Sequence, residues 1–320
     1  MESAIGPLLP LFERERAAGK ALALGVLLHT EGSTYRKRGA LILIAADGEY
    51  AGLVSGGCLE GDLSHYAREV IESGEARIVS YDLRHAADEL WGLGLGCEGA
   101  MRILLLRLDR DNNWQPLAHF SRALVDYQPA SAEIVVESVP GGPPLGSITF
   151  STALESNNTA AHLFVLRLAL PPRILLLGAG PDAAPVVEFA ARLGWQVTVM
   201  DHRSSYARPE KFPQAARVIP ARAEDLAHTL DLKNFAAAVV MSHHLGSDRA
   251  YLSALAQSPI GFVGLLGPPV RRARLLAELG PLAASLQNRL RAPVGLALGG
   301  RAPESIALAI VAELHAFLHG

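Results

Sequence analysis

The 320-residue sequence contains only two cysteines, Cys58 and Cys97. Two cysteines in a chain of this length do not form a disulfide framework, so we expect reduced thiols and a cytoplasmic protein. The stretch 13–16 is a run of four charged residues where a secretory signal would need apolar ones, and we expect no signal peptide.

Charge of one sign, long apolar runs and aromatic residues are also scarce. The formal net charge is −3 and no block of like charge occurs, which argues against non-specific nucleic-acid binding. No uncharged apolar run reaches the length of a membrane span. Aromatic residues make up 6% of the chain while Ala, Leu and Gly are abundant, a composition that suits an α/β fold.

The length and the pattern along the chain indicate two principal domains. We expect an N-terminal α/β domain with a mixed sheet at 1–110, with a helix over 2–18 and a hairpin turn at Asp47-Gly48. A connecting segment with a helix and strands is expected at 111–170. After Pro171-Pro172, short apolar strands alternate with helices to residue 320, which predicts a doubly wound, Rossmann-like parallel sheet.

The first cysteine lies in a glycine-rich turn, Ser55-Gly56-Gly57-Cys58, directly before an apolar-periodic segment that is typical of a helix. Glycines let backbone N–H groups converge on a ligand, and a helix N-terminus favours an anion or a thiolate. The turn therefore suits an anion held beside a reactive sulfur. A tight turn with a small buried cysteine is an equally good interpretation of the motif alone.

The segment Gly178-Ala179-Gly180-Pro181-Asp182-Ala183 matches the dinucleotide fingerprint between a predicted strand and a predicted helix. Asp201 ends the next predicted strand, where an acidic residue can accept a hydrogen bond from a ribose hydroxyl. Pro181 removes one N–H donor, and Asp182 places a negative charge where a pyrophosphate would lie. The glycines can equally serve strand–helix packing, with Asp182 as a helix cap.

Two further groups of polar residues are candidates for a site in this second domain. His243 and His244 follow a predicted strand, but adjacent side chains diverge and no third metal ligand is suitably spaced, which favours structural or loop-lining roles. Arg271, Arg272 and Arg274 lie on a predicted helix, where such spacing is typical of a solvated face and less often of an anion site.

The motifs together resemble the XdhC/CoxI family. In the N-terminal half the resemblance rests on the stretches 31–40, 55–61 and 96–99, and the Ser-Gly-Gly-Cys stretch is its most specific part. In the C-terminal half it rests on the stretches 178–180, 199–203, 261–267, 271–274, 292–296 and 303–307, which resemble the Rossmann domain that accompanies the first one.

The resemblance implies an accessory protein that binds the molybdenum cofactor, supports its sulfuration and inserts it into a xanthine dehydrogenase-type molybdenum hydroxylase, rather than an enzyme. The implied partners are that apoenzyme and a cysteine desulfurase. Such a cofactor carries a phosphate, a pterin and a dithiolene-bound metal; backbone N–H groups and arginines suit the phosphate, and a thiolate suits the metal or a transferable sulfur. The candidate cofactor-binding residues are Arg36, Arg38, Ser55, Gly56, Gly57, Cys58, Glu60, Cys97, Gly178, Gly180 and Asp201, with Cys58 and Cys97 as the candidate molybdenum or sulfur ligands.

Alternatives remain open at this point. Gly178, Gly180 and Asp201 also suit an NAD(P)-dependent oxidoreductase, or a Rossmann protein that senses a nucleotide without turnover. Cys97 and the arginine pair can instead be a small filler in a glycine bend and a solvated basic loop. The apolar final helix can pack on the sheet or on a second copy of the chain, so a homodimer is a further expectation.

Overall fold

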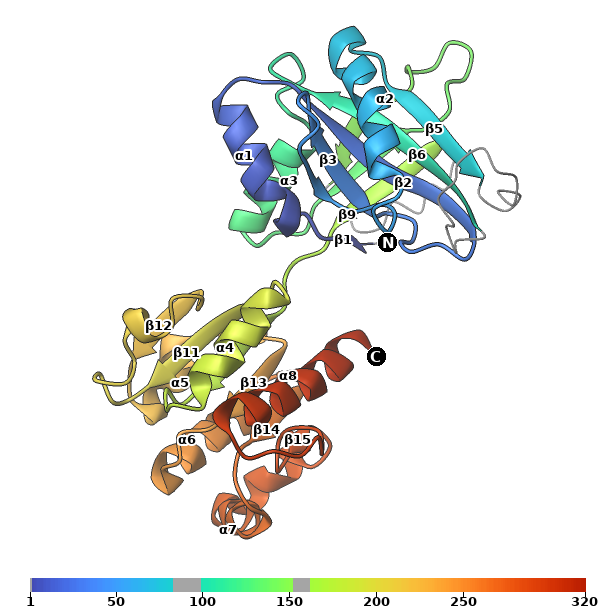
Figure 1. Ribbon diagram of the computed structural model, residues 1–320. Helices are drawn as coiled ribbons and strands as arrows, with labels where there is room; N and C mark the ends of the chain where they lie inside the picture. Colours follow the sequence, from blue (N-terminus) through green and yellow to red (C-terminus); the bar gives the residue numbers. More distant parts are fainter. Residues whose placement is uncertain (1, 83–98, 152–161) are drawn as a thin grey trace. The chain divides into compact units, whose positions relative to one another are not determined.

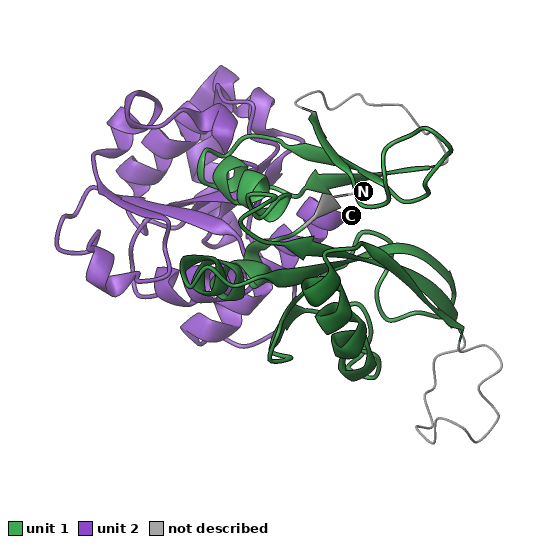
Figure 2. Ribbon diagram, turned by 90° about the horizontal axis from the view of Figure 1, so that it is seen from above, with its two compact units in different colours: residues 1–170 green, residues 171–320 purple. Residues whose placement is uncertain are grey.

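The computed structural model describes residues 2–82, 99–151 and 162–320. The chain folds as two compact units, Met1–Leu170 and Pro171–Gly320. They are green and purple in Figure 2. The expected architecture, an N-terminal α/β unit followed by a Rossmann-like unit, is confirmed. Within the described residues no helix is both long enough and apolar enough to cross a bilayer.

The larger sheet of the first unit has five antiparallel strands in the order β4-β3-β2-β6-β5 (Figure 1). Its strands are β2 (Leu22–Gly32), β3 (Leu41–Ala45), β4 (Tyr50–Gly52), β5 (Arg77–Asp82) and β6 (Gly99–Leu108). The predicted turn at Asp47-Gly48 joins β3 to β4, and Gly48 has φ +91°, which glycine adopts without strain. The first seven residues of β2 are all buried because both faces of the sheet are covered.

A second sheet of four strands completes this unit, in the order β1-β9-β7-β8. Its strands are β1 (Glu2–Ser3), β7 (Ser131–Val135), β8 (Ile148–Ser151) and β9 (Leu163–Leu168). The helix expected over 2–18 is wrong in its first part, because Glu2 and Ser3 pair with β9 and Pro7 precedes the helix α1 (Leu9–Ala17). From the segment expected to connect the domains, Phe120, Ile134 and Leu166 are buried in the core of the first unit.

Both faces of the five-stranded sheet are covered by other elements. One face is covered by α2 (Glu60–Ser73), whose Leu63, Ala67 and Val70 pack against Ile42, Ile103 and other strand residues. The other face packs on α1, on α3 (Leu117–Val125) and on the four-stranded sheet, where β7 and β9 contribute apolar side chains. Burial of apolar side chains holds α2 against the sheet. The glycine-rich turn lies directly before α2, so its position relative to the sheet is set by the same packing.

The second unit has six parallel strands in the order β12-β11-β10-β13-β14-β15, which is the Rossmann order (Figure 1). These strands are β10 (Arg173–Leu177), β11 (Gln196–Asp201), β12 (Arg217–Pro220), β13 (Ala237–Val240), β14 (Phe262–Leu265) and the short β15 (Leu290–Arg291). The order reverses between β10 and β13, so the crevice at their carboxyl ends is where a Rossmann ligand would lie.

Helices cover both faces of this parallel sheet. Helices α4 (Ala183–Arg192) and α8 (Pro303–His319) pack together on one face. Helices α5 (Leu226–Thr229), α6 (Leu245–Ala256) and α7 (Pro269–Leu279) lie on the other. Short 3-10 segments connect elements of the chain at Gly6–Leu8, Pro209–Lys211, Ala223–Asp225, Leu232–Asn234 and Gly280–Leu286.

Candidate functional site

The glycine-rich turn of the first unit is organised around the carboxylate of Glu60. This side chain is only 1% exposed, and its Oε1 accepts hydrogen bonds from the backbone N–H of Ser55 (2.9 Å) and Val54 (3.3 Å). The hydroxyl of Ser55 donates to Oε2 of the same carboxylate. Glu60 therefore supplies a negative charge inside the turn and holds the turn through three hydrogen bonds.

The electrostatics of Glu60 follow from these contacts. Burial by itself raises the pKa of the carboxyl group, but the hydrogen bonds from Ser55 and from the backbone N–H groups outweigh it and hold the pKa below the ordinary value. Glu60 is consequently a charged acceptor at neutral pH. A buried carboxylate with several donors stabilises a turn that contains two glycines.

The hydroxyl oxygen of Ser55 connects the carboxylate to the cysteine. It accepts from the backbone N–H of Leu59 (3.2 Å) and of Gly57 (3.3 Å), and the Sγ of Cys58 lies 3.6 Å away. The thiol of Cys58 is therefore a third donor to this oxygen, and the Ser55 hydroxyl ties the sulfur to the turn. Cys58 is a free, partly buried cysteine beside the start of α2.

Two amides of the turn have no hydrogen-bond partner within the described residues, those of Gly56 and Cys58. They alternate with the amides of Ser55, Gly57 and Leu59, each of which donates a hydrogen bond to the side chain of Glu60 or Ser55. A Cβ built on Gly57 would meet no atom within 4 Å, so the surface beside this residue is open. The predicted cradle of backbone donors is thus present in part, with two unpaired N–H groups instead of a complete set.

The loop after β2 places three cations in a row, Arg36, Lys37 and Arg38. The Nζ of Lys37 lies 3.5 Å from the hydroxyl of Thr34, and the guanidinium of Arg38 stacks over the ring of Phe164 at 4.9 Å. Across the described ranges none of the three side chains forms an ion pair with a carboxylate. Unpaired cations on adjacent residues favour an anionic ligand.

A cavity of about 470 Å³ lies against this loop. Its polar lining consists of Tyr35 and the three cations, and none of the described residues that line it is acidic. Its floor is apolar and comes from the approach to α1, from β3 and from the strand end that leads to the turn. The floor residues are Ala4, Pro7, Leu8, Ala40, Leu41, Gly52, Leu53 and Ala169, with Gly39 beside them.

The structure brings the basic loop and the cysteine turn together. The ring of Tyr35 lies 3.7 Å from the position that a Cβ on Gly56 would occupy. Gly99, at the start of β6, is packed so closely below the loop that a Cβ there would lie 2.6 Å from the carbonyl oxygen of Ser33. The predicted ligand Cys97 and its neighbours up to 98 lie outside the described residues. The motifs at 31–39, 55–60 and 99 therefore converge on one end of the sheet.

The second unit contains the predicted glycine turn after β10. Gly178 has φ +124°, and a Cβ on it would lie 2.5 Å from the carbonyl carbon and oxygen of Met241. A Cβ on Gly180 would find only ordinary contacts, the nearest at 3.6 Å to the ring of His243. The first glycine is thus required by close packing of two strand ends, as the packing interpretation of the motif expected.

Asp201 has a different role from the expected ribose acceptor. It is fully buried, its Oδ1 accepts from the backbone N–H and Nε of Arg203, and its Oδ2 accepts from Arg203 Nη2 (2.7 Å) and the backbone N–H of Ala179 (2.8 Å). Four donors complete the capacity of a carboxylate. Burial alone raises the pKa of Asp201, but the bonds from Arg203 and Ala179 hold it below its ordinary value.

The crevice at the strand-order reversal is also occupied by side chains of the protein. His243, in a left-handed conformation with φ +60°, directs Nε2 to the carboxylate of Asp182 at 3.1 Å, beside Gly180. Asp182 stands directly before the first residue of α4 but makes no side-chain cap bond. His244 turns away and caps α6 by accepting from the N–H of Ser247. The two histidines diverge, as predicted.

The interpretation of Arg271 as part of a solvated face is wrong. Its Nε and Nη2 donate to the fully buried Asp248 at 2.9 and 2.5 Å, and Asp248 also accepts from the hydroxyl of Ser242. Arg272 and Arg274 are not part of this buried pair. Sequence spacing could not reveal the pair because Asp248 and Arg271 lie on different helices, α6 and α7.

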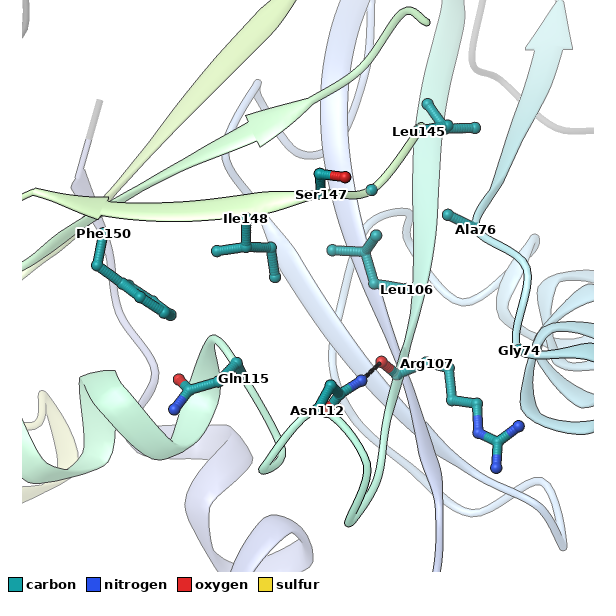
Figure 3. Close-up of a pocket in the computed structure, with 11 residues that line it drawn as sticks. Gly74, Ala76, Leu106, Arg107, Asn112, Gln115, Leu145, Ser147, Ile148 and Phe150 are labelled. Carbon is teal, nitrogen blue, oxygen red and sulfur yellow. Dashed lines mark hydrogen bonds between the residues drawn. The ribbon is translucent and has the colours of Figure 1, made fainter. Parts of the chain in front are cut away.

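A further cavity of the first unit, of about 360 Å³, is distinct from the candidate site (Figure 3). It lies between the turn after α2, β6, the loop before α3 and the start of β8. Leu106, Leu145, Ile148 and Phe150 supply apolar walls, and Asn112 donates to the backbone oxygen of Arg107 at 2.6 Å. None of the predicted site residues lines it.

The fold and the site define a class of two-unit α/β proteins, in which a cysteine-bearing glycine turn precedes a Rossmann-like unit. Residues 15–82 match the model of the XdhC and CoxI family, and residues 174–314 match that of the XdhC Rossmann domain. A curated relative from Bacillus subtilis, named as a probable xanthine dehydrogenase subunit, is 31% identical over 306 residues, which cover 91% of each chain. The chain belongs to the XdhC and CoxI family.

Two other relatives extend the comparison. The Escherichia coli protein named molybdenum cofactor insertion chaperone PaoD is 24% identical over 300 residues, covering 93% of this chain and 83% of that one. A crystal structure described as a xanthine dehydrogenase from Bacillus halodurans is 29% identical, with a TM-score of 0.83 and coverage of 97% of this chain and 95% of that one. The name of the Escherichia coli relative, an insertion chaperone, agrees with the expected accessory role.

Proposed function

We propose that this protein binds the molybdenum cofactor in its first unit and delivers it to a molybdenum hydroxylase of the xanthine dehydrogenase type. The observation that carries the proposal is the convergence of the Cys58 turn with the basic loop around Arg36. The names of the relatives, one a cofactor insertion chaperone and the other a probable xanthine dehydrogenase subunit, support the same assignment.

The donor set suits the chemistry of such a cofactor. A phosphate needs cations and N–H donors. The cavity offers Arg36, Lys37 and Arg38, none of which pairs with a carboxylate of the described residues, and the nearby turn offers the amides of Gly56 and Cys58, which have no partner among the same residues. A soft metal or a transferable sulfur needs a cysteine sulfur, which Cys58 supplies. When bound, the cofactor supplies the redox-active metal centre that the recipient enzyme uses.

The chain's own residues then have separate tasks. Arg36 and Lys37 attract and hold the phosphate, while Arg38 is fixed against Phe164 and adds positive charge at the rim. Ser55 and Glu60 hold the turn so that the Cys58 thiol stays beside the open surface at Gly57. Cys97, which the family resemblance implies as a second ligand, completes the proposed set.

The finer part of the proposal concerns sulfuration and transfer. Holding the cofactor by its phosphate leaves the metal end accessible, so that a cysteine desulfurase can deliver sulfur before insertion. Arg36 and Lys37 are exposed, so their contacts with the phosphate are expected to be weak. Weak contacts suit a carrier because the cofactor has to dissociate from it before it enters the apoenzyme. The Rossmann glycines Gly178 and Gly180 have no part in cofactor binding in this proposal.

The test is anaerobic binding of molybdenum cofactor to the purified full chain, with molybdenum and pterin measured after desalting. We expect about one cofactor per chain for the wild type and clearly less for Cys58→Ser. Arg36→Ala combined with Lys37→Ala should weaken binding and reduce its salt dependence. Arg222→Ala, an exposed arginine of the second unit, is the matched control.

Two results would contradict the proposal in different ways. Wild-type protein that retains no cofactor removes the proposed function. Normal binding by both Cys58→Ser and Cys97→Ser leaves the phosphate contacts in place but removes the thiol from the mechanism.

A further inference from the structure

Tyr35 is an exposed aromatic residue at the junction of the two motifs. Its side chain is 65% exposed, it lines the 470 Å³ cavity, and its ring lies against Gly56 of the cysteine turn. It is followed directly by the three cations. A tyrosine ring in this position adds apolar, planar surface to a rim that is otherwise positively charged.

The surface next to this ring is open and lined by backbone. A Cβ on Gly56 would be in ordinary contact with the Tyr35 ring at 3.7 Å, whereas a Cβ on Gly57 would meet nothing within 4 Å. The two amides of the turn that have no partner within the described ranges, those of Gly56 and Cys58, belong to this same stretch. Glycine backbone beside an aromatic ring leaves room for a flat group with polar edges.

Tyr35 is the residue that joins the cavity to the cysteine turn. The cavity is lined by Tyr35 and the three cations, which suit an anion, and the Tyr35 ring also lies beside Gly56, which is outside the cavity lining. A ligand that contacts both the cations and the exposed ring is an anionic group joined to a planar ring system. A simple phosphate would leave the aromatic surface uncovered.

We propose that Tyr35 is a specificity-determining residue that stacks on the planar ring system of the bound cofactor while Arg36 and Lys37 hold its phosphate. This inference rests on the proposed function and assigns to the aromatic ring the selection of a pterin over small anions. Tyrosine suits this task because its rigid ring loses little conformational entropy on stacking. Its hydroxyl has no hydrogen-bond partner within the described residues and is not needed for the stacking.

The experiment compares the full-length wild type with Tyr35→Phe and Tyr35→Ala. Anaerobic binding of molybdenum cofactor is measured by ultrafiltration, and competition by inorganic phosphate is measured in parallel. We expect Tyr35→Phe to bind within about twofold of the wild type and Tyr35→Ala to bind on the order of tenfold more weakly, the range seen when a stacking ring is removed. The affinity for inorganic phosphate alone should be unchanged in both variants.

A spectroscopic readout separates stacking from a structural effect. With ring-labelled tyrosine, the Tyr35 resonance, assigned by its loss in Tyr35→Phe, should shift when cofactor is added and stay in place with phosphate alone. Tyr50→Ala is the matched control, because Tyr50 is an exposed tyrosine on β4 that does not line the cavity. Its binding should equal that of the wild type, and melting temperatures check that each variant is folded.

The outcomes are distinguishable. Equal cofactor affinity of Tyr35→Ala and wild type, without a resonance shift, overturns the stacking role and leaves the proposed function standing. A wild type that binds phosphate but no cofactor overturns both.

Discussion

The carboxylate of Glu60 accepts both the backbone N–H and the hydroxyl hydrogen of Ser55, five residues earlier in the chain. This pair closes the glycine-rich turn from within. An internal anion at this place explains how a turn with two adjacent glycines keeps one geometry, because the carboxylate collects donors that would otherwise be unpaired and buried. The thiol of Cys58 is presented by a turn that is already rigid.

Replacement of Glu60 by Gln should destabilise the first unit. The amide nitrogen would face the Ser55 hydroxyl, whose oxygen already accepts from Gly57 and Leu59. Leaving buried donors poorly paired costs about 1–3 kcal/mol, which denaturant unfolding would detect. Glu72→Gln, an exposed position on the same helix, is the control, and an equal effect of both variants would contradict this role for Glu60.

The same carboxylate predicts a pH dependence. Because the pKa of Glu60 in the folded protein lies below its ordinary value of 4.5, its contribution to stability is fully present above about pH 4.5. The contribution is lost as the pH falls through the folded-state pKa. Unfolding curves recorded between neutral pH and pH 3 should therefore be less steeply pH-dependent for Glu60→Gln than for the wild type; identical pH profiles would argue against a charged Glu60.

The two Rossmann glycines should respond differently to alanine. Gly178→Ala places a methyl group 2.5 Å from the Met241 carbonyl at a positive φ, and we expect a loss of about 1–3 kcal/mol in unfolding free energy, the usual cost of overpacking. Gly180→Ala meets no atom closer than 3.6 Å and should be nearly neutral. Similar melting temperatures for the two variants would show that the close approach is relieved by a backbone shift.

The second unit should not bind NADH or NADPH at millimolar concentrations. Every acceptor position of Asp201 is engaged by Arg203 and Ala179, and the Asp182–His243 pair lies beside Gly180 where a pyrophosphate would approach. Calorimetric titration of the four nicotinamide cofactors checks this expectation. Saturable binding of any of them would mean that Arg203 leaves Asp201 in solution.

Much of the second unit was predictable from local pattern. Short apolar strands alternating with helices indicated the parallel sheet, since a strand buried on both faces needs a continuous apolar run. β15 is two residues long and carries no such pattern, so it was not expected. In the first unit the strand β9 was missed, and with it the pairing that turns Glu2 and Ser3 into β1, because a two-residue strand exists only through its partner.

In the candidate site, too, some features were predictable from local sequence and others depend on tertiary contacts. Residue types and spacing pointed to the Cys58 turn, the basic loop and the Rossmann glycines as candidates, although each motif also had a purely structural interpretation. Spacing could not show that Tyr35 lies against Gly56, since the contact joins two loops about twenty residues apart. Nor could it show that Asp201 and Asp248 are each bound to an arginine of their own unit.

The sequence by itself determined the two-unit α/β architecture and the parallel sheet of the second unit. Secondary-structure propensity and apolar periodicity depend only on short segments, so they can be recognised without knowledge of the tertiary contacts. Only the tertiary structure decided which polar groups are already satisfied. Glu60 and Asp201 were expected to meet a ligand, but burial forces a carboxylate to take the nearest donors, and those donors belong to the protein. Among the described residues, the cations of the basic loop and the exposed ring of Tyr35 stay available for a partner.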